Sequence, residues 1–146
     1  MKIFVDADAC PVQNEVIQVA KEKNVQVVLV KSFSHFSLEQ LPDFVQTIYV
    51  DPGQDSADYK IIELAQQGDI VVTQDYGLAS LCLAKGCIPL HHRGFIFTEK
   101  NIDRLLTTRH IHAKMRRAGH RTKGVRAFTT SQREKFSNVL RRLLPN

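Results

Sequence analysis

The sequence predicts an α/β fold, a three-layer, Rossmann-like arrangement in which a parallel sheet of about five strands lies between helices and is followed by basic C-terminal helices. Short β-branched runs alternate, over the first 90 residues, with stretches in which apolar residues recur at helical spacing. This alternation is typical of βαβ units, whose right-handed crossovers build a covered parallel sheet. The chain has 146 residues, of which 43% are hydrophobic, which is enough for one core. We therefore expect a single domain, with residues 1–90 as an acidic α/β body and residues 91–146 as a basic helical extension.

The expected strands and helices follow one another at regular intervals. Strands are expected at residues 3–5, 25–30, 47–50, 69–73 and 87–90, and helices at residues 11–23, 56–67, 77–85, 99–117 and 131–144. Pro11 suits a first helical position because its missing N–H would have no partner there, and Asn24 suits a helix end. Residues 32–42 show no clear period, so we expect a loop with at most one helical turn. Pro89 favours an edge position for the last strand.

Charge is divided unevenly between the two parts of the chain. Residues 1–90 hold 6 Lys and Arg against 12 Asp and Glu, whereas residues 91–146 hold 14 against 3, so the net charge of +5 combines −6 with +11. Clustered Lys and Arg attract phosphate backbones and gain free energy by releasing counterions. We therefore favour a nucleic-acid partner over a merely solvated basic face. The candidate phosphate contacts are Arg93, Arg109, Lys114, Arg116, Arg117, Arg121, Lys123 and Arg126.

Several other classes of protein are disfavoured. The first apolar run, residues 3–5, is too short for a targeting segment, and no run approaches the roughly 20 residues of a membrane span. The three cysteines are odd in number and lack a Cys-x-x-Cys pair, so we expect a cytoplasmic protein without membrane contact or a disulfide framework. Neither a Gly-x-Gly-x-x-Gly nor a Walker A loop is present. The histidines match no zinc spacing, and we expect them to be neutral at the surface or to contact phosphate.

Three carboxylates follow expected strands. Asp6 and Asp8, spaced i, i+2, come directly after strand 3–5, and Asp75 follows strand 69–73 in the same way. If the strands lie in the order 3-2-1-4-5, the first and the fourth are neighbours where the winding reverses, and a crevice opens at their carboxyl ends. Asp6, Asp8 and Asp75 would then face one another.

A second pair of acids, Asp55 and Asp58, brackets the start of helix 56–67, with Asp51 just before it. Alone, this pair is typical of an N-cap followed by an acidic third residue, and Asp75 could likewise cap the next helix. Asp6 is harder to explain by local structure, because a strand end within a sheet offers little water. Capping and functional interpretations are both open for the other acids.

Carboxylates that lie close together repel one another, and this repulsion has to be compensated. Two like charges about 4 Å apart repel by roughly 4 kcal/mol at an effective dielectric of 20, so a cluster needs cations or raised pKa values. Ligation by oxygen alone favours Mg²⁺ or Mn²⁺ over Zn²⁺. The sequence therefore predicts a divalent-cation site.

The motifs around these acids resemble those of the bacterial YaiI/YqxD family. The resemblance is carried by Val-Asp-Ala-Asp-Ala-Cys-Pro-Val at residues 5–12, Asp-Ser-Ala-Asp at 55–58, Val-Thr-Gln-Asp-Tyr-Gly-Leu-Ala at 72–79, Arg93-Gly94 and Asn101-Ile102. That family is biochemically uncharacterised, but it is similar to PIN-like domains, which are mostly metal-dependent ribonucleases. The resemblance thus implies a single PIN-like domain that acts on RNA rather than DNA with Mg²⁺ or Mn²⁺.

Carried over residue by residue, the strand-end acid of PIN-like domains falls on Asp6, the helix acid on Asp58 and the acid after the fourth strand on Asp75, which Thr73 supports. Two metal ions about 4 Å apart can activate a water and stabilise the leaving oxygen in phosphodiester cleavage. The resemblance implies that Asp6 is the central ligand and that Asp58 and Asp75 flank it.

Three further residues are assigned to the site. Asp8 could bind metal or orient the water, and Asp55 is a candidate addition. Cys10 departs from the PIN-like pattern, as does Asp in place of the more usual Glu on the helix. A helix N-terminus lowers a thiol pKa, but nearby carboxylates disfavour the thiolate, so we favour packing over a redox or nucleophilic role for Cys10.

Two alternatives to a nuclease are open. A hydrophobic strand that ends in Asp-x-Asp also opens the haloacid-dehalogenase phosphatases, in which Asp6 would be the nucleophile and Asp8 the acid; the late acidic pair of those enzymes is lacking. The other alternative is a non-catalytic RNA-binding module. Three aromatic residues of the basic third are expected in the core rather than stacked on bases: Phe95, Phe97 and Phe128.

Overall fold

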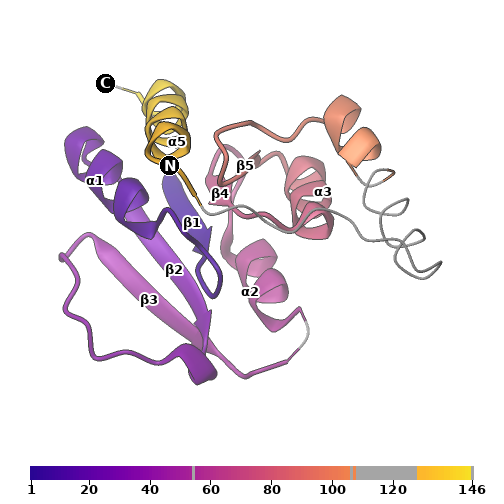
Figure 1. Ribbon diagram of the computed structural model, residues 1–146. Coiled ribbons are helices and arrows are strands. Elements are labelled where there is room, and N and C mark those ends of the chain that lie inside the picture. Colours follow the sequence, from indigo (N-terminus) through magenta and orange to yellow (C-terminus); the bar gives the residue numbers. More distant parts are fainter. Residues whose placement is uncertain (54, 106, 108–127, 146) are drawn as a thin grey trace, which may run out of the picture.

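The computed structural model describes residues 1–53, 55–105, 107 and 128–145 and has an α/β architecture (Figure 1). Five strands, paired in parallel throughout, form one sheet in the order β3-β2-β1-β4-β5. The strands are β1 (Lys2–Asp6), β2 (Gln26–Ser32), β3 (Val45–Val50), β4 (Ile70–Val72) and β5 (Ile88–Leu90). The predicted strand order is confirmed, and β5 lies at an edge as its proline indicated.

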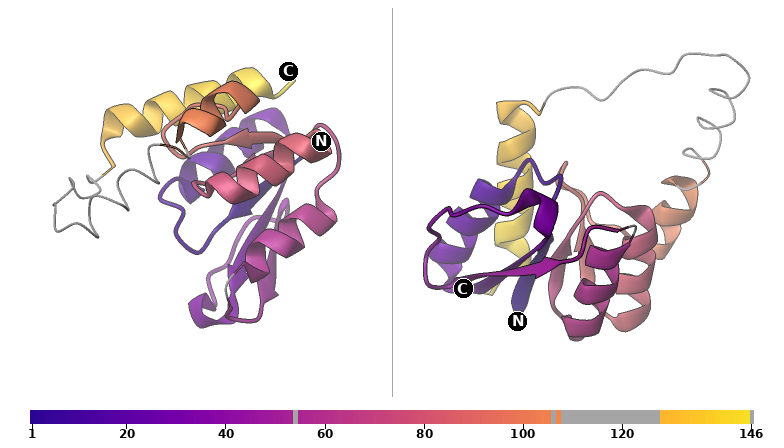
Figure 2. Two further views of the ribbon diagram at one scale, coloured as in Figure 1. Left: turned by 90° about the vertical axis from the view of Figure 1, so that its right-hand side faces the viewer. Right: turned by 90° about the horizontal axis from the view of Figure 1, so that it is seen from below.

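Helices cover both faces of the sheet, which gives the three layers (Figure 2). Helices α1 (Gln13–Lys23) and α5 (Thr130–Leu143) lie on one face, and α2 (Ser56–Leu64) and α3 (Tyr76–Lys85) on the other. Successive strand residues point to opposite faces, so Val5 and Leu29 pack on the α1 side while Phe4 and Val30 pack on the α2 side. Strand β2 is therefore buried on both faces, as its continuous β-branched run predicted.

The first helix begins two residues later than predicted. Pro11 lies in a turn, α1 starts at Gln13 after Val12, and the Pro11 carbonyl accepts a hydrogen bond from Arg133 Nη1 (2.5 Å). The predicted end is confirmed: Asn24 adopts a left-handed conformation (φ 57°), and its N–H bonds to carbonyls of the last turn. Helix α2 ends at Leu64 rather than at residue 67.

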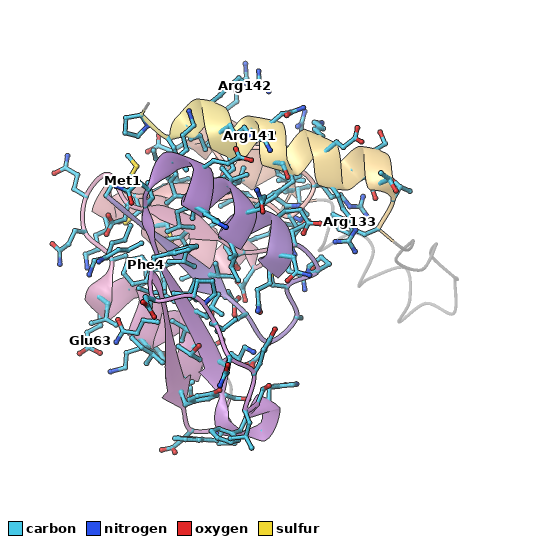
Figure 3. The ribbon with its side chains drawn as sticks, turned by 90° about the vertical axis from the view of Figure 1, so that its left-hand side faces the viewer. Met1, Phe4, Glu63, Arg133, Arg141 and Arg142 are labelled. Carbon is cyan, nitrogen blue, oxygen red and sulfur yellow. The ribbon has the colours of Figure 1, made fainter. Side chains whose placement is uncertain are left out.

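Helix α5 packs on α1 through apolar and charged contacts (Figure 3). A capping box between Thr129 and Gln132 begins the helix. Phe136 and Leu140 are fully buried in the same cluster as strand β1. Helix α5 in the C-terminal third therefore contributes to the hydrophobic core on the α1 side of the sheet.

Residues 91–107 complete the described body. Residues 99–105 and 107 are helical, and the rest of the expected helix 99–117, like the basic loop 118–126, lies outside the described residues. Phe97 is fully buried with Phe95 packed against it, and Phe128 packs on the α1-side core, so the predicted core role of these rings is confirmed. The loop after β2 contains one short 3-10 helix, η1 (Phe33–His35). Within the described residues, every helix is too short or too polar to cross a bilayer.

Candidate functional site

The pairing register of β1 and β4 places the first two residues of the candidate site next to each other. Val5 pairs with Val72, so the next residues, Asp6 and Thr73, lie side by side where both strands end. The Thr73 hydroxyl donates a hydrogen bond to Asp6 Oδ2 (3.0 Å) and accepts one from the Asp75 N–H (3.0 Å). One buried hydroxyl therefore connects the strand-end carboxylate to the turn that carries the second.

Asp75 caps helix α3. Its Oδ1 accepts a hydrogen bond from the Leu78 N–H (3.0 Å), so the predicted capping role is confirmed. A Cβ atom at position 77 would lie 3.2 Å from the same oxygen, and Gly77 leaves the carboxylate this space. Capping does not remove Asp75 from the site, because the residue also lines the acidic pocket described next.

One pocket of about 180 Å³ opens at the carboxyl ends of the central strands. It gathers all five predicted acids, Asp6, Asp8, Asp55, Asp58 and Asp75. Its remaining lining is Ser32, Val50, Asp51, Gly53, Ser56 and Ala57. Acids from three separate segments of the chain thus share one small cavity, which we call the acidic pocket.

Helix α2 places Asp55 and Asp58 at the positions that the capping interpretation expects, but without the capping hydrogen bond. Asp55 is the N-cap residue, yet it is left-handed (φ 66°), and its side chain makes no capping hydrogen bond. Asp tolerates this conformation better than most residues. The Asp55 side chain instead hydrogen-bonds to Asp58, in the first turn of α2, and both line the acidic pocket.

Burial and neighbouring carboxylates raise the pKa values of two pocket acids, Asp6 and Asp58. Burial raises the pKa of Asp6, the Thr73 hydroxyl lowers it, and the negative charges of Asp75 and Asp8 raise it. Burial, followed by Asp75, Asp6 and Asp55, raises the pKa of Asp58 to about 7. At neutral pH Asp58 is therefore divided between its protonated and ionised forms, which relieves part of the repulsion in the pocket.

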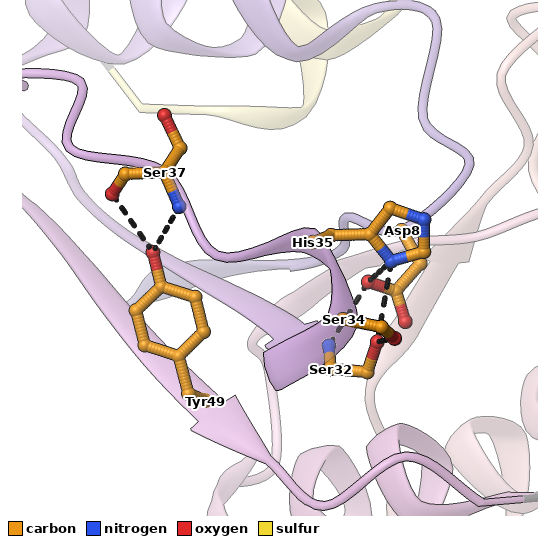
Figure 4. Close-up of polar contacts among 6 residues, drawn as sticks. All are labelled: Asp8, Ser32, Ser34, His35, Ser37 and Tyr49. Carbon is orange, nitrogen blue, oxygen red and sulfur yellow. Dashed lines mark hydrogen bonds and ion pairs between the residues drawn. The ribbon is translucent and has the colours of Figure 1, made fainter.

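Asp8 is held by the segment after β2 (Figure 4). Its Oδ1 accepts a hydrogen bond from the Ser32 N–H (2.9 Å) and lies 3.0 Å from His35 Nδ1. Ser32 Oγ lies 3.2 Å from the same His35 nitrogen and 2.7 Å from Ser34 Oγ. Sequence analysis missed His35, because nothing in an aperiodic loop signals contact with a carboxylate 27 positions earlier.

The acidic pocket fits a hydrated divalent cation by its donor chemistry. Its side-chain donors are oxygen atoms alone, as Mg²⁺ and Mn²⁺ prefer. Within the described part of the chain, no three His, Cys, Asp or Glu side chains are grouped in a way that could hold one ion. Mg²⁺ usually keeps several waters and takes one or two carboxylates, so Asp6 with Asp75 or Asp58 is the donor set that matches this habit.

Cys10 is half-buried near the carboxylates of the pocket. The pKa of the half-buried Cys10 thiol is raised to about 12, first by burial and then by Asp6 and Glu15, which agrees with packing rather than thiol chemistry.

The expectation that the histidines lie at the surface is wrong for His92, which is only 2% exposed. It is the second residue after strand β5, and neither of its ring nitrogens has a hydrogen-bond partner among the described residues.

The predicted phosphate contacts are described only in part. Arg93 is exposed after β5. The other seven, Arg109, Lys114, Arg116, Arg117, Arg121, Lys123 and Arg126, lie outside the described residues. In α5, Arg133 and Arg141 form ion pairs with Glu15 and Glu22 of α1, so part of the basic third compensates acids of the body.

Comparison with known proteins identifies the family. A UPF0178 protein of Bacillus thuringiensis is 54% identical over 145 residues, with 99% of each chain covered. A UPF0178 protein of Oceanobacillus iheyensis is 55% identical over 139 residues, with 95% of each chain covered. No solved structure is significantly similar. The model of the family described as "Uncharacterized BCR, YaiI/YqxD family" matches residues 4–146, and the chain therefore belongs to the YaiI/YqxD family.

Proposed function

We propose that the protein is a cytoplasmic phosphodiesterase that cleaves nucleic acid, RNA in preference to DNA, with Mg²⁺ or Mn²⁺. The observation that carries the proposal is the convergence of Asp6, Asp8, Asp55, Asp58 and Asp75 on one pocket at the point where the strand order reverses. Burial and neighbouring carboxylates raise the pKa values of Asp6 and Asp58, and a divalent cation would relieve this repulsion. The three cysteines are free thiols, which suits a reducing cytoplasm.

Each residue has a role in this proposal. A bound divalent ion would neutralise the carboxylates, activate a water and stabilise the leaving oxygen of the phosphodiester. Asp6, held by Thr73, would be the main ligand, and Asp58 and Asp75 would flank it, one of them as the second ligand. Asp8 orients the attacking water or adds a ligand, and its hydrogen bond to Ser32 and its contact with His35 hold it at the pocket rim. Exposed basic residues of the C-terminal third hold the strand without reading its sequence.

The decisive experiment compares the purified wild type with Asp6→Asn on mixed RNA and DNA oligonucleotides in Mn²⁺. We expect cleavage by the wild type and a loss of at least about 100-fold in the variant, because a main ligand is removed. Asp43→Asn is the matched control, since Asp43 is exposed and does not line the pocket. Equal cleavage by wild type and Asp6→Asn would mean that a contaminating nuclease acts.

Cation binding is measured separately from cleavage. We expect Mn²⁺ to raise the melting temperature of the wild type and of Asp43→Asn but not of Asp6→Asn, because a ligand that binds only the folded state stabilises it. The same shift in all three proteins would place the ion away from the acidic pocket. Cation binding without any loss of single-stranded RNA would favour a non-catalytic RNA-binding module.

A phosphatase of the haloacid-dehalogenase type is the alternative chemistry. It needs Asp6 as the nucleophile and Asp8 as a proton donor, but the contacts of Asp8 with Ser32 and His35 occupy Oδ1 of that carboxylate. Trapping of a phosphorylated Asp6 with a small phosphomonoester would favour this alternative over the nuclease.

A further inference from the structure

Three aromatic side chains form a partly exposed cluster that lies across η1 from the acidic pocket. The Phe33 ring stacks on the Tyr49 ring (centroids 5.5 Å apart, planes inclined by 19°), and Phe36 lies 5.2 Å from the same ring at 44°. Phe33 is 53% and Phe36 58% exposed, unlike the buried rings of the core. We call these three side chains the aromatic platform.

The aromatic platform is held in place rather than loosely attached. The Tyr49 hydroxyl donates to the Ser37 carbonyl (3.4 Å), and the Ser37 N–H lies 3.5 Å from the same oxygen. Tyr49 also sits in β3, where its register partner in β2 is Lys31. Paired residues of neighbouring parallel strands lie on the same face, so a cationic side chain accompanies the rings.

The aromatic platform is continuous with the acidic pocket through η1. Ser32 lines the pocket and directly precedes Phe33, while His35, which contacts Asp8, directly precedes Phe36. Figure 4 shows Tyr49 on one side of η1 and the contact between His35 and Asp8 on the other. A chain that lay across η1 would thus meet rings on one side and carboxylates on the other.

We propose that the aromatic platform binds unpaired nucleobases and that the substrate of the acidic pocket is therefore single-stranded nucleic acid. This inference rests on the proposed function, since the strand held here is the one whose phosphodiester enters the pocket. Every base has a face that can stack on an aromatic ring, whatever its sequence, and Lys31 can pair with the adjoining phosphate. Bases within a duplex are already stacked and cannot use the rings.

Fluorescence anisotropy of a labelled 12-nucleotide oligouridylate tests the aromatic platform in full-length Asp6→Asn protein with Mg²⁺. We expect Phe33→Leu/Phe36→Leu to weaken binding by about 5- to 100-fold, because the substitution keeps apolar bulk and removes the stacking faces. Leu38→Ala is the matched control, since Leu38 is 87% exposed on the same loop and carries no ring. On an abasic strand of equal length, the double variant and its parent should bind equally.

Separate outcomes overturn separate claims. Equal binding of the oligouridylate with and without the rings, or the same loss on the abasic strand, would refute the aromatic platform. Sedimentation that shows dimers in the parent and monomers in the double variant, with unchanged strand binding, would refute it in favour of a second copy of the chain. If the rings are needed for binding but the wild type never cleaves, the proposed function fails while the binding surface stands.

Discussion

Thr73 is the residue that connects the two strands of the candidate site. It is fully buried, and its hydroxyl both donates to Asp6 and accepts from the backbone of Asp75. A valine has nearly the same shape but lacks the hydroxyl, so it would leave a buried carboxylate without its donor and an N–H without its acceptor. Thr73 therefore matters for the geometry of the pocket without contacting a substrate.

We expect Thr73→Val to lower the free energy of unfolding by about 2 kcal/mol, because unpaired buried polar groups cost roughly 1–3 kcal/mol each. Thr73→Ser keeps the hydroxyl and loses one methyl group, which costs about 1 kcal/mol. Urea denaturation of the three proteins measures the difference. A Thr73→Val variant as stable as the wild type would mean that the hydroxyl contributes nothing.

At the scale of elements, the contact between α5 and α1 contains two ion pairs with different surroundings. Arg133 lies 3.2 Å from Glu15, whose side chain is 21% exposed, and it also donates to the Pro11 carbonyl. Arg141 lies 2.7 Å from Glu22, and both side chains are nearly 40% exposed. Water screens the second pair more strongly than the first.

Arg133→Gln should therefore destabilise the protein by about 1–2 kcal/mol, because Glu15 keeps a partly buried charge without its partner. Arg141→Gln should destabilise the protein less than Arg133→Gln, because water screens an exposed ion pair. The two variants change the same side chain on the same helix, so their denaturation curves compare burial directly. A larger loss for Arg141→Gln would contradict this ranking.

Much of the element order was predictable because each signal is local. The strand order alone predicts that Asp6 and Asp75 lie close together, since the carboxyl ends of neighbouring parallel strands meet. The start of α1 was misplaced, because a proline suits a turn as well as a first helical position. The aromatic platform was missed for another reason: Phe33, Phe36 and Tyr49 come from a loop and an edge strand whose packing no sequence period records.

At the scale of the whole molecule, buried histidines oppose the carboxylates in their response to pH. The pKa of His92 is lowered to about 4 by burial, and that of His91 to about 4 by burial, His92 and Arg93. The raised pKa of Asp58 acts in the opposite direction, because its folded form takes up a proton below pH 7 before the unfolded chain does. The wild-type curve sums both effects, so a variant is needed to separate them.

The His92→Leu variant separates the pH-dependent contribution of this histidine from that of the carboxylates. The unfolded chain protonates this histidine below about pH 6.5, whereas the folded protein resists protonation until about pH 4. His92 therefore makes its full contribution to the free energy of unfolding above pH 6.5, and this contribution is lost as the pH falls towards 4. Relative to the wild type, His92→Leu should gain on the order of 2 kcal/mol in unfolding free energy between pH 7.5 and pH 4.5.

Urea denaturation at a series of pH values measures that gain. Val27→Ala is the control, because Val27 is fully buried in the core between the sheet and α1 and does not titrate, so its difference from the wild type should stay constant with pH. Parallel curves for the wild type and His92→Leu would show that His92 takes up its proton equally in the folded and unfolded states. Both ring nitrogens lack partners within the part of the chain that the structure describes, which argues against that result, since a buried imidazolium would there have two N–H donors and no acceptor.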